Sequence, residues 1–340
     1  MNLMQKLRLS PITQKRLQSF QKDRLAFGSL IALTTLFLLS AAAELIANDK
    51  PYILKYDSRI YFPVFSEPLA ADLGITDSYT VDYRKLDLAG RGWAVFPPVK
   101  FNPFQSNEAV ESYPSKPTLQ NPMGTDDRGR DVFARLLYGF RISFFYALGV
   151  WAITYLMGVS SGLCMGFFGG KVDFVGQRLV EVISSIPQFF LLIILVSIFE
   201  PSMWLLVGIS AAFGWINISY YLRAEGLKLR RLEFVEGARA MGLPTWKILL
   251  RHVLPNALTP IITFSPFAIA AGITGLAALD YLGFGLAPPT PSWGELLNQA
   301  KKNFTTAWWL AFFPSLALFS TLTLLNFVGE GLRNAFDPRK

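Results

Sequence analysis

A polar stretch between two long apolar runs reads EFVEGARAMGLPTWKILLRHVLPN, from Glu233 to Asn256. Its first glutamates stand near the predicted start of a short helix, where carboxylates suit the positive end of the helix dipole. Gly242 can adopt the positive φ angle that ends a helix, and Pro244 suits the first turn of a second helix. The apolar side of that second helix consists of Trp246, Ile248, Leu249 and Leu250. The residues therefore predict two short helices joined by a sharp turn, a rigid element able to transmit a push. An ordinary interfacial loop is the alternative that these residues leave open.

The composition of the whole chain is that of a membrane protein. Of its 340 residues, 52% are hydrophobic and only 16% are charged, whereas soluble domains usually carry about 25% charged residues. The net charge of +8 comes from basic residues at the ends of apolar segments, which argues against nucleic-acid binding. Cys164 is the single cysteine and His252 the single histidine, so neither an intrachain disulfide nor a metal site is predicted.

Six apolar segments have about the length that a membrane-spanning helix needs, roughly 20 residues. They are Leu25–Ala43, Phe144–Phe168, Val182–Phe199, Ser202–Leu222, Ala257–Leu279 and Ala307–Val328. A cleaved signal peptide is the competing interpretation of the first segment, because its last three alanines resemble a cleavage site. The long basic lead and the long apolar run favour an uncleaved span.

These spans predict the organisation of the chain. It comprises an N-terminal tail (1–24), a first span (25–46), a segment outside the membrane (47–141), a five-helix core (142–337) with a loop over 223–256, and a short tail (338–340). Residues 47–120, called the insert below, are rich in proline and mixed charge and contain no apolar run of spanning length. They predict loops and short elements rather than an independent domain.

The distribution of basic residues predicts the orientation. With six spans, both termini lie on the same side as the 223–256 loop, which carries seven Lys and Arg. Because basic residues accumulate on the cytoplasmic side, both termini and this loop are predicted to be cytoplasmic and the 47–141 segment periplasmic.

Small residues recur in the second span. Gly158, Gly162, Gly166 and Gly170 follow one another at intervals of four, which lines one helix face and predicts close packing against another helix. The same span contains GVSSG, a match to the serine-hydrolase pattern, with Ser160 at its centre. An intramembrane serine protease that uses His252 as its base is the remote alternative this pattern leaves open.

Several motifs together resemble the permease subunits of bacterial ABC importers. The "EAA" loop of that family is matched by Glu236, Gly237, Ala238, Gly242, Leu254 and Pro255. GTDDRGRDVFARLLYGFRIS (124–143), SSIPQFFLLI (184–193), DYLGFGL (280–286) and PPTPSWGELLN (288–298) are similar to the C-type dipeptide/oligopeptide permeases. The insert looks most like that of the microcin C/peptide importer permease. No P-loop sequence occurs in the chain.

The resemblance implies an all-α membrane protein of the bacterial inner membrane, with six transmembrane helices, a type I ABC importer permease fold and a periplasmic insert between spans 1 and 2. It implies a non-enzymatic permease that moves peptides, including peptide antibiotics such as microcin C, from periplasm to cytoplasm by alternating access. A permease for nickel or another small solute in the same family is the alternative.

The resemblance also implies partners. They are a homologous B-type permease subunit, cytoplasmic ABC ATPase subunits (two chains or one fused chain), a periplasmic peptide-binding protein and membrane lipid, without nucleic acid. No cofactor or metal is expected in this chain, because ATP and Mg²⁺ would bind to the ATPase subunits.

Two sets of residues are the predicted functional positions. Those implied to dock on the ATPase are Glu233, Glu236, Gly237, Ala238, Arg239, Gly242, Leu243 and Pro244. Those of the family signature on the periplasmic side are Gly124, Thr125, Asp126, Gly129, Arg130, Asp131, Arg135 and Arg141. Asp280, where the family often has serine, is a candidate for the substrate pathway, with a hydrogen-bonded structural carboxylate as the alternative.

Overall fold

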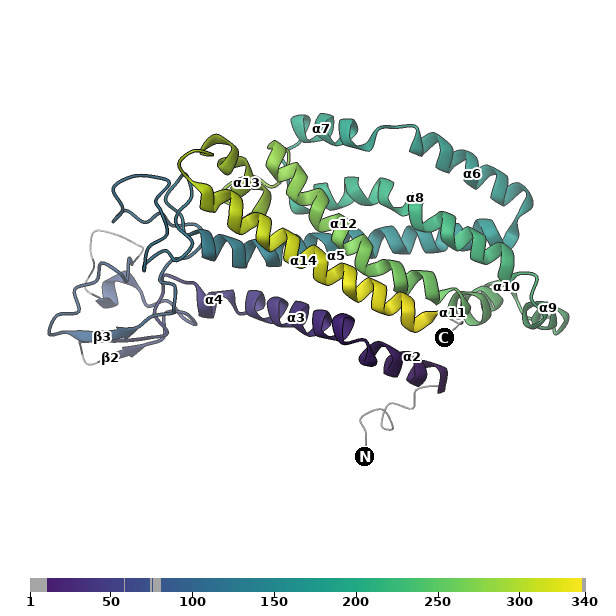
Figure 1. Ribbon diagram of the computed structural model, residues 1–340, viewed down its shortest axis with the longest axis horizontal. Coiled ribbons are helices and arrows are strands. Elements are labelled where there is room, and N and C mark those ends of the chain that lie inside the picture. Colours follow the sequence, from purple (N-terminus) through teal and green to yellow (C-terminus); the bar gives the residue numbers. More distant parts are fainter. Residues whose placement is uncertain (1–10, 58, 74, 76–80, 338–340) are drawn as a thin grey trace. The chain divides into compact units, whose positions relative to one another are not determined.

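The computed structural model describes residues 11–57, 59–73, 75 and 81–337, and the described chain is mostly helical (Figure 1). The predicted tail 338–340 and the first ten residues of the predicted N-terminal tail lie outside this range. The helices are α2 (Pro11–Lys22), α3 (Arg24–Ala41), α4 (Ala43–Ile46), α5 (Val132–Phe168), α6 (Gly170–Ser184), α7 (Gln188–Ile198), α8 (Met203–Leu229), α9 (Glu233–Ala240), α10 (Thr245–Ile248), α11 (Leu254–Asn256), α12 (Leu258–Leu282), α13 (Trp293–Lys302) and α14 (Trp308–Phe336). The shorter elements are strands β1 (Ile53–Tyr56), β2 (Arg59–Tyr61) and β3 (Gly92–Val95), the 3₁₀ turn η1 (Ala70–Leu73) and the π-helical turn η2 (Leu249–Val253).

The chain forms two compact units. One comprises the described residues up to Leu33, Phe144–Leu276 and the described residues from Ser320 onward; the other comprises Thr34–Ser143 and Ala277–Phe319. Four long helices, α3, α5, α12 and α14, contribute residues to both units.

Among the described residues, five helices are long and apolar enough to cross a membrane: α3, α5, α8, α12 and α14. The pair α6 and α7 makes a sixth span if its two helices, bent by 64° relative to each other, are counted as one. This number agrees with the predicted six-span fold. The third span, predicted as continuous over 182–199, is instead broken at 185–187. The break follows from Pro187, which has no N–H to donate and disfavours helical geometry in the residue before it.

The second helix differs from its predicted bounds at the N-terminal end. It begins at Val132 rather than Phe144, so α5 contains 37 residues. Helix-forming residues such as Leu136 and Arg141 continue the helical pattern before the apolar run begins. Hydropathy alone missed these turns because they carry charge.

The insert contains a small antiparallel sheet that the sequence analysis did not predict. The strand order is β2-β1-β3, and Lys55 of β1 lies opposite Ile60 on one side and Trp93 on the other. One face of the sheet is buried with Leu54 and Tyr56 against Leu73 and Tyr83. The strands are three or four residues long, too short for a clear alternating pattern in the sequence.

Three of the four predicted glycines form the seam between α5 and α8. A Cβ added to Gly158, Gly162 or Gly166 would clash with the carbonyl oxygen of Trp215, Ser219 or Arg223, respectively. Such close backbone approach is what small residues at helix interfaces permit. Gly170 is not part of the seam, contrary to the prediction: its Cβ would meet nothing, and its φ of +51° belongs to the turn that starts α6.

We expect Gly166→Val to lower the free energy of unfolding by about 1–3 kcal/mol, because the added side chain must push α8 away from α5. The measurement is denaturation of the purified full chain in detergent. Gly208→Ala is the control, since a Cβ at Gly208 in α8 would contact nothing. Equal stability of the Gly166→Val variant and the wild-type chain would show that the seam is not tightly packed.

Candidate functional site

The predicted ATPase-docking helix is α9, an eight-residue helix with one buried and one exposed side. Val235 and Ala238 are buried and pack in one cluster with Leu222 and Leu229 of α8. Glu233, Glu236 and Gly237 lie on the exposed side, and the two glutamates form no ion pair with any described residue. The helix is therefore anchored through its apolar side while its acidic side remains available.

Gly242 ends α9 in the way that the sequence predicts. Its φ is +74°, and its N–H donates to the carbonyl of Arg239 at 2.9 Å. The N–H of Leu243 donates to the carbonyl of Ala238 at 3.2 Å, and Leu243 packs against the core beneath the loop. This pair of hydrogen bonds is the Schellman motif, which fixes the direction in which the chain leaves the helix. Pro244 then precedes the first residue of α10.

The second half of the loop is less regular than predicted. The four residues of α10 continue into the π-helical turn η2 and then α11. Ile248 and Val253 are the buried residues, whereas Trp246 and Leu250, predicted on the apolar side of a helix, are 60% and 59% exposed. Ile248 and Leu249 thus face the core as predicted, whereas Trp246 and Leu250 do not; the π turn changes the helical period from Leu249 onward.

Arg239 is exposed to solvent and also contacts another residue of the same chain. Its guanidinium carbon lies 4.9 Å from the centre of the Phe167 ring at the end of α5. This cation–π contact ties α9 to the helix that carries the glycine seam. Phe234 and Met241, which the sequence analysis did not select, are 41% and 75% exposed on the same loop. Together with Trp246 they add apolar surface beside the glutamates, as at protein-binding sites.

The signature residues form a buried ion-pair cluster in the other unit. Arg130 Nε donates to Asp126 Oδ2 at 2.7 Å, and Arg130 Nη2 donates to Glu295 Oε1 at 3.0 Å. Arg135 pairs with the other oxygen of Glu295, and its Nε lies 3.4 Å from Asp126 Oδ2. Arg130 is 2% exposed and Arg135 is fully buried. The cluster joins the first turn of α5 and the residues before it to α13, a pairing that the sequence does not reveal because Glu295 is 160 residues from Arg135.

Further contacts give the other signature residues structural roles. Asp131 Oδ1 accepts from the Ala134 N–H at 2.7 Å, which caps the start of α5, and burial raises the pKa of this carboxyl to about 6. The Thr125 carbonyl accepts from the Trp309 indole at 3.0 Å, and Arg141 pairs with Glu44 at 2.8 Å. Gly124 and Gly129 have positive φ angles in the same turns.

Asp280 is held by hydrogen bonds within its own unit. Its Oδ1 accepts from the Leu286 N–H at 2.7 Å, and its Oδ2 bonds to the Ser292 hydroxyl. The residue is only 7% exposed. This environment favours the structural alternative over a role in contacting substrate.

A cavity of about 430 Å³ lies among α5, α7, α8 and α12. Its polar lining consists of uncharged groups, namely Tyr146, Trp151, Thr154, Tyr155, Gln188, Ser210, Asn217 and Tyr221. Within the lining, Tyr146 and Ser210 are hydrogen-bonded at 2.7 Å, and the Trp151 indole donates to Ser265, outside the lining, at 3.0 Å. No pattern along a single segment predicts this cavity, because its lining comes from four helices.

Comparison with known proteins places these features in a family. Residues 136–340 match the family described as binding-protein-dependent transport system inner membrane component. The chain is 42% identical over 338 residues to "Inner membrane ABC transporter permease protein YejE" of Escherichia coli K12, covering 98% of this chain and 99% of the relative. It is 38% identical over 360 residues to "Peptidoglycan transport system permease protein YejE" of Agrobacterium fabrum C58, covering 97% and 94%.

A shorter relative and a solved structure agree with this result. "Oligopeptide transport system permease protein OppC" of Haemophilus influenzae is 35% identical over 216 residues, covering 64% of this chain and 70% of the relative. A chain of the inward-facing MetNI methionine ABC transporter matches with a TM-score of 0.51 and 16% identity, covering 60% of this chain and 98% of that chain. The latter likeness supports the fold alone.

The fold and the comparisons together define a multi-pass transport permease of the inner membrane. The chain belongs to the family of binding-protein-dependent transport system inner membrane components, the permease subunits of ABC importers.

We expect Glu295→Gln to destabilise the chain by about 3 kcal/mol, because it leaves two buried arginines with Asp126 as their shared carboxylate. This figure is at the lower end of the range for a broken buried pair, since Glu295 itself is 17% exposed. Denaturation of the full chain in detergent measures the change. Arg178→Gln, which breaks an exposed ion pair with Glu181, is the control and should cost less than about 1 kcal/mol. Equal effects of the two substitutions would contradict this account of the cluster.

Proposed function

We propose that this chain is one permease subunit of an ATP-driven importer that moves peptides from the periplasm to the cytoplasm by alternating access. The observation that carries the proposal is the 223–256 loop, which is braced against α5 and α8 by Val235, Ala238 and Arg239. It ends α9 with a fixed turn and presents acidic and apolar side chains outward. A chain with such an element and no P-loop sequence needs a separate ATPase to drive it.

The proposed coupling site presents the exposed side of α9 and the turn after it, with residues Glu233, Glu236, Gly237, Arg239, Gly242 and Pro244. Ala238 and Leu243, also predicted to dock, instead anchor this site to the core beneath it. When a bound ATPase subunit moves, the anchored helix moves with it and carries α5 and α8. ATP and Mg²⁺ bind to the ATPase subunits, so this chain contributes force transmission rather than catalysis.

The remaining partners follow from the same proposal. A homologous B-type permease completes the pathway, a periplasmic peptide-binding protein delivers the substrate, and lipid surrounds the spans. Both termini and the 223–256 loop face the cytoplasm, in keeping with the seven basic residues of that loop. The insert then faces the periplasm.

The substrate pathway of this subunit includes the cavity among α5, α7, α8 and α12. Its uncharged hydrogen-bonding groups, such as Gln188 and Asn217, match the amides of a peptide backbone, and its aromatic rings offer contact for varied side chains. Gln188 is the first residue of α7, directly after the break at Pro187, so a change in the bend would move its amide. A pathway without charged groups suits peptides of many sequences.

Peptides are the substrate class that the relatives favour. Their names include dipeptide, oligopeptide and glutathione transport systems, and the relative from Agrobacterium is named for peptidoglycan, which contains peptide stems. Peptide antibiotics such as microcin C fall within this class. Nickel or another small solute remains the second candidate, although the described residues contain no group of three metal-ligating side chains.

The structure offers no support for the protease alternative. The Ser160 hydroxyl donates to the carbonyls of Leu156 and Met157 in its own helix, at 2.6 and 3.0 Å. This is the usual bonding of a serine inside a membrane helix rather than that of an activated nucleophile.

We expect the chain, reconstituted in vesicles with its B-type permease, ATPase subunits and binding protein, to accumulate labelled trialanine when ATP is present on the ATPase side. The measurement is peptide retained in the vesicles over time. Nickel ion, tested in the same vesicles, should not accumulate. Uptake of nickel without uptake of peptide would replace the proposal with the second candidate.

In the same vesicles, we expect Gly242→Val to retain ATP hydrolysis while lowering peptide uptake at least about tenfold, because a β-branched residue resists the φ of +74° that orients α9. Gly208→Ala in α8 is the control, since its Cβ would contact nothing, its backbone is helical and it lies outside the proposed coupling site. Normal uptake by the Gly242→Val variant would show that the fixed turn does not transmit the movement of the ATPase.

A further inference from the structure

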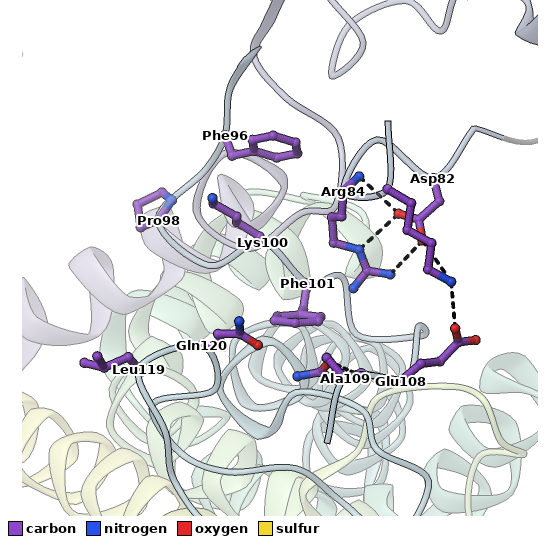
Figure 2. Close-up of a pocket in the computed structure, with 12 residues that line it drawn as sticks. Asp82, Arg84, Phe96, Pro98, Lys100, Phe101, Glu108, Ala109, Leu119 and Gln120 are labelled. Atoms are coloured by element: carbon purple, nitrogen blue, oxygen red, sulfur yellow. Dashed lines mark hydrogen bonds and ion pairs between the residues drawn. The ribbon is translucent and has the colours of Figure 1, made fainter. Parts of the chain in front are cut away.

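A second cavity lies wholly within the unit that contains the insert. Its volume is about 520 Å³, in the range of about 300–1,000 Å³ that small-molecule sites occupy. Its lining comes from the loop around Arg84, the segment after β3 from Phe96 to Phe101, and the residues near Glu108 and Leu119. Figure 2 shows these side chains around one space.

Both carboxylates that line this cavity are already paired. Asp82 accepts from Arg84 Nε at 3.2 Å and Arg84 Nη2 at 3.4 Å, and Glu108 accepts from Lys85 at 2.7 Å (Figure 2). Lys100, a third cation, has no carboxylate partner among the described residues and lies 5.1 Å from the centre of the Phe96 ring. The cavity therefore carries an excess positive charge at a defined position.

Arg84 is fixed in place before any ligand arrives. Two of its nitrogens are held by Asp82, and its guanidinium carbon lies 4.9 Å from the centre of the Phe101 ring, which is itself buried. Its Nη1 makes no hydrogen bond to a described residue. A guanidinium held in this way is prepared to donate to an oxygen anion at little further cost in side-chain entropy.

Apolar groups lie beside the two cations. The Phe96 and Phe101 rings and Pro98 line the cavity, and Leu119 at its edge projects fully into solvent. An exposed leucine next to aromatic rings offers contact for an apolar side chain. A ligand matching both features carries an anion and an apolar group a few ångströms apart.

We propose that this cavity binds the C-terminal carboxylate of a short peptide together with its last apolar side chain. Arg84 Nη1 would donate a charge-assisted hydrogen bond to the carboxylate, Lys100 on the Phe96 side of the cavity would add attraction through its charge, and the side chain would lie against the apolar lining (Figure 2). The biological role of this site rests on the proposed peptide substrate.

The site differs in chemistry from the uncharged cavity among α5, α7, α8 and α12. A peptide whose C-terminus is blocked as an amide retains its backbone and side chains but loses the anion. Of these two cavities, the insert cavity alone carries charged groups that distinguish the two forms, and this difference makes the proposal testable on the full chain.

The experiment measures fluorescence anisotropy of Ala-Ala-Phe, labelled at its N-terminus with a neutral fluorophore, with the full chain in lipid nanodiscs. We expect the free acid to bind about tenfold more tightly than the C-terminal amide, the scale of one hydrogen bond to a charged group. Lys100→Ala should reduce this preference by removing a positive charge from the cavity, and high salt should weaken it. Lys116→Ala, which alters an exposed lysine outside the cavity, is the matched control.

Arg84→Gln should also reduce the preference. If that variant misfolds, Lys100→Ala still tests the proposal, because Lys100 is exposed and has no carboxylate partner among the described residues. Equal affinities for acid and amide in the wild-type chain would overturn the proposal, as would an unchanged preference in Lys100→Ala. Binding of the purified periplasmic binding protein without binding of either peptide would also overturn it and would identify the cavity as a docking surface. Because this assay needs neither ATP nor partners, its result is independent of the vesicle uptake experiment.

Discussion

The close approach of α5 and α8 is the contact on which the proposed coupling site depends. At Gly158, Gly162 and Gly166 the backbone of one helix touches the other, since any Cβ would meet a carbonyl of α8. The contact brings the ends of both helices together, where Arg223 of α8 also pairs with Asp173 at the start of α6. On this base the apolar side of α9 is packed, so the loop is a rigid extension of two spans rather than a flexible connection.

The unit that contains the insert depends on buried ion pairs rather than on close helix packing. Its buried arginines and carboxylates join the first turn of α5 and the residues before it to α13, and the Trp309 indole bonds to the Thr125 carbonyl. Buried ion pairs add little stability over apolar packing but strongly penalise any arrangement that separates their members. The signature residues thus define one arrangement of the loops near the second span, which explains why they match a family pattern without lining either cavity.

Two cavities with opposite chemistry suit two steps of peptide handling. The cavity among the spans is lined by uncharged polar and aromatic groups, which in the proposed importer would accept peptide backbone without regard to sequence. The cavity in the insert places Lys100 and Arg84 beside aromatic rings and so favours a free terminus. In the proposed importer, the cavity among the spans would accept many peptide sequences, and the insert cavity would recognise the free C-terminal carboxylate that linear peptides share.

The sequence by itself determined the membrane class, the number of spans and the turn at Gly242, because these depend on local hydropathy and on backbone angles that few residues adopt. It did not reveal the bend of 64° in the third span, the early start of α5, or the π turn that follows α10. The partner of Arg135 and the linings of both cavities were also decided only by the tertiary structure. These features join residues far apart in the chain, and a pattern along one segment carries no information about which distant side chain completes it.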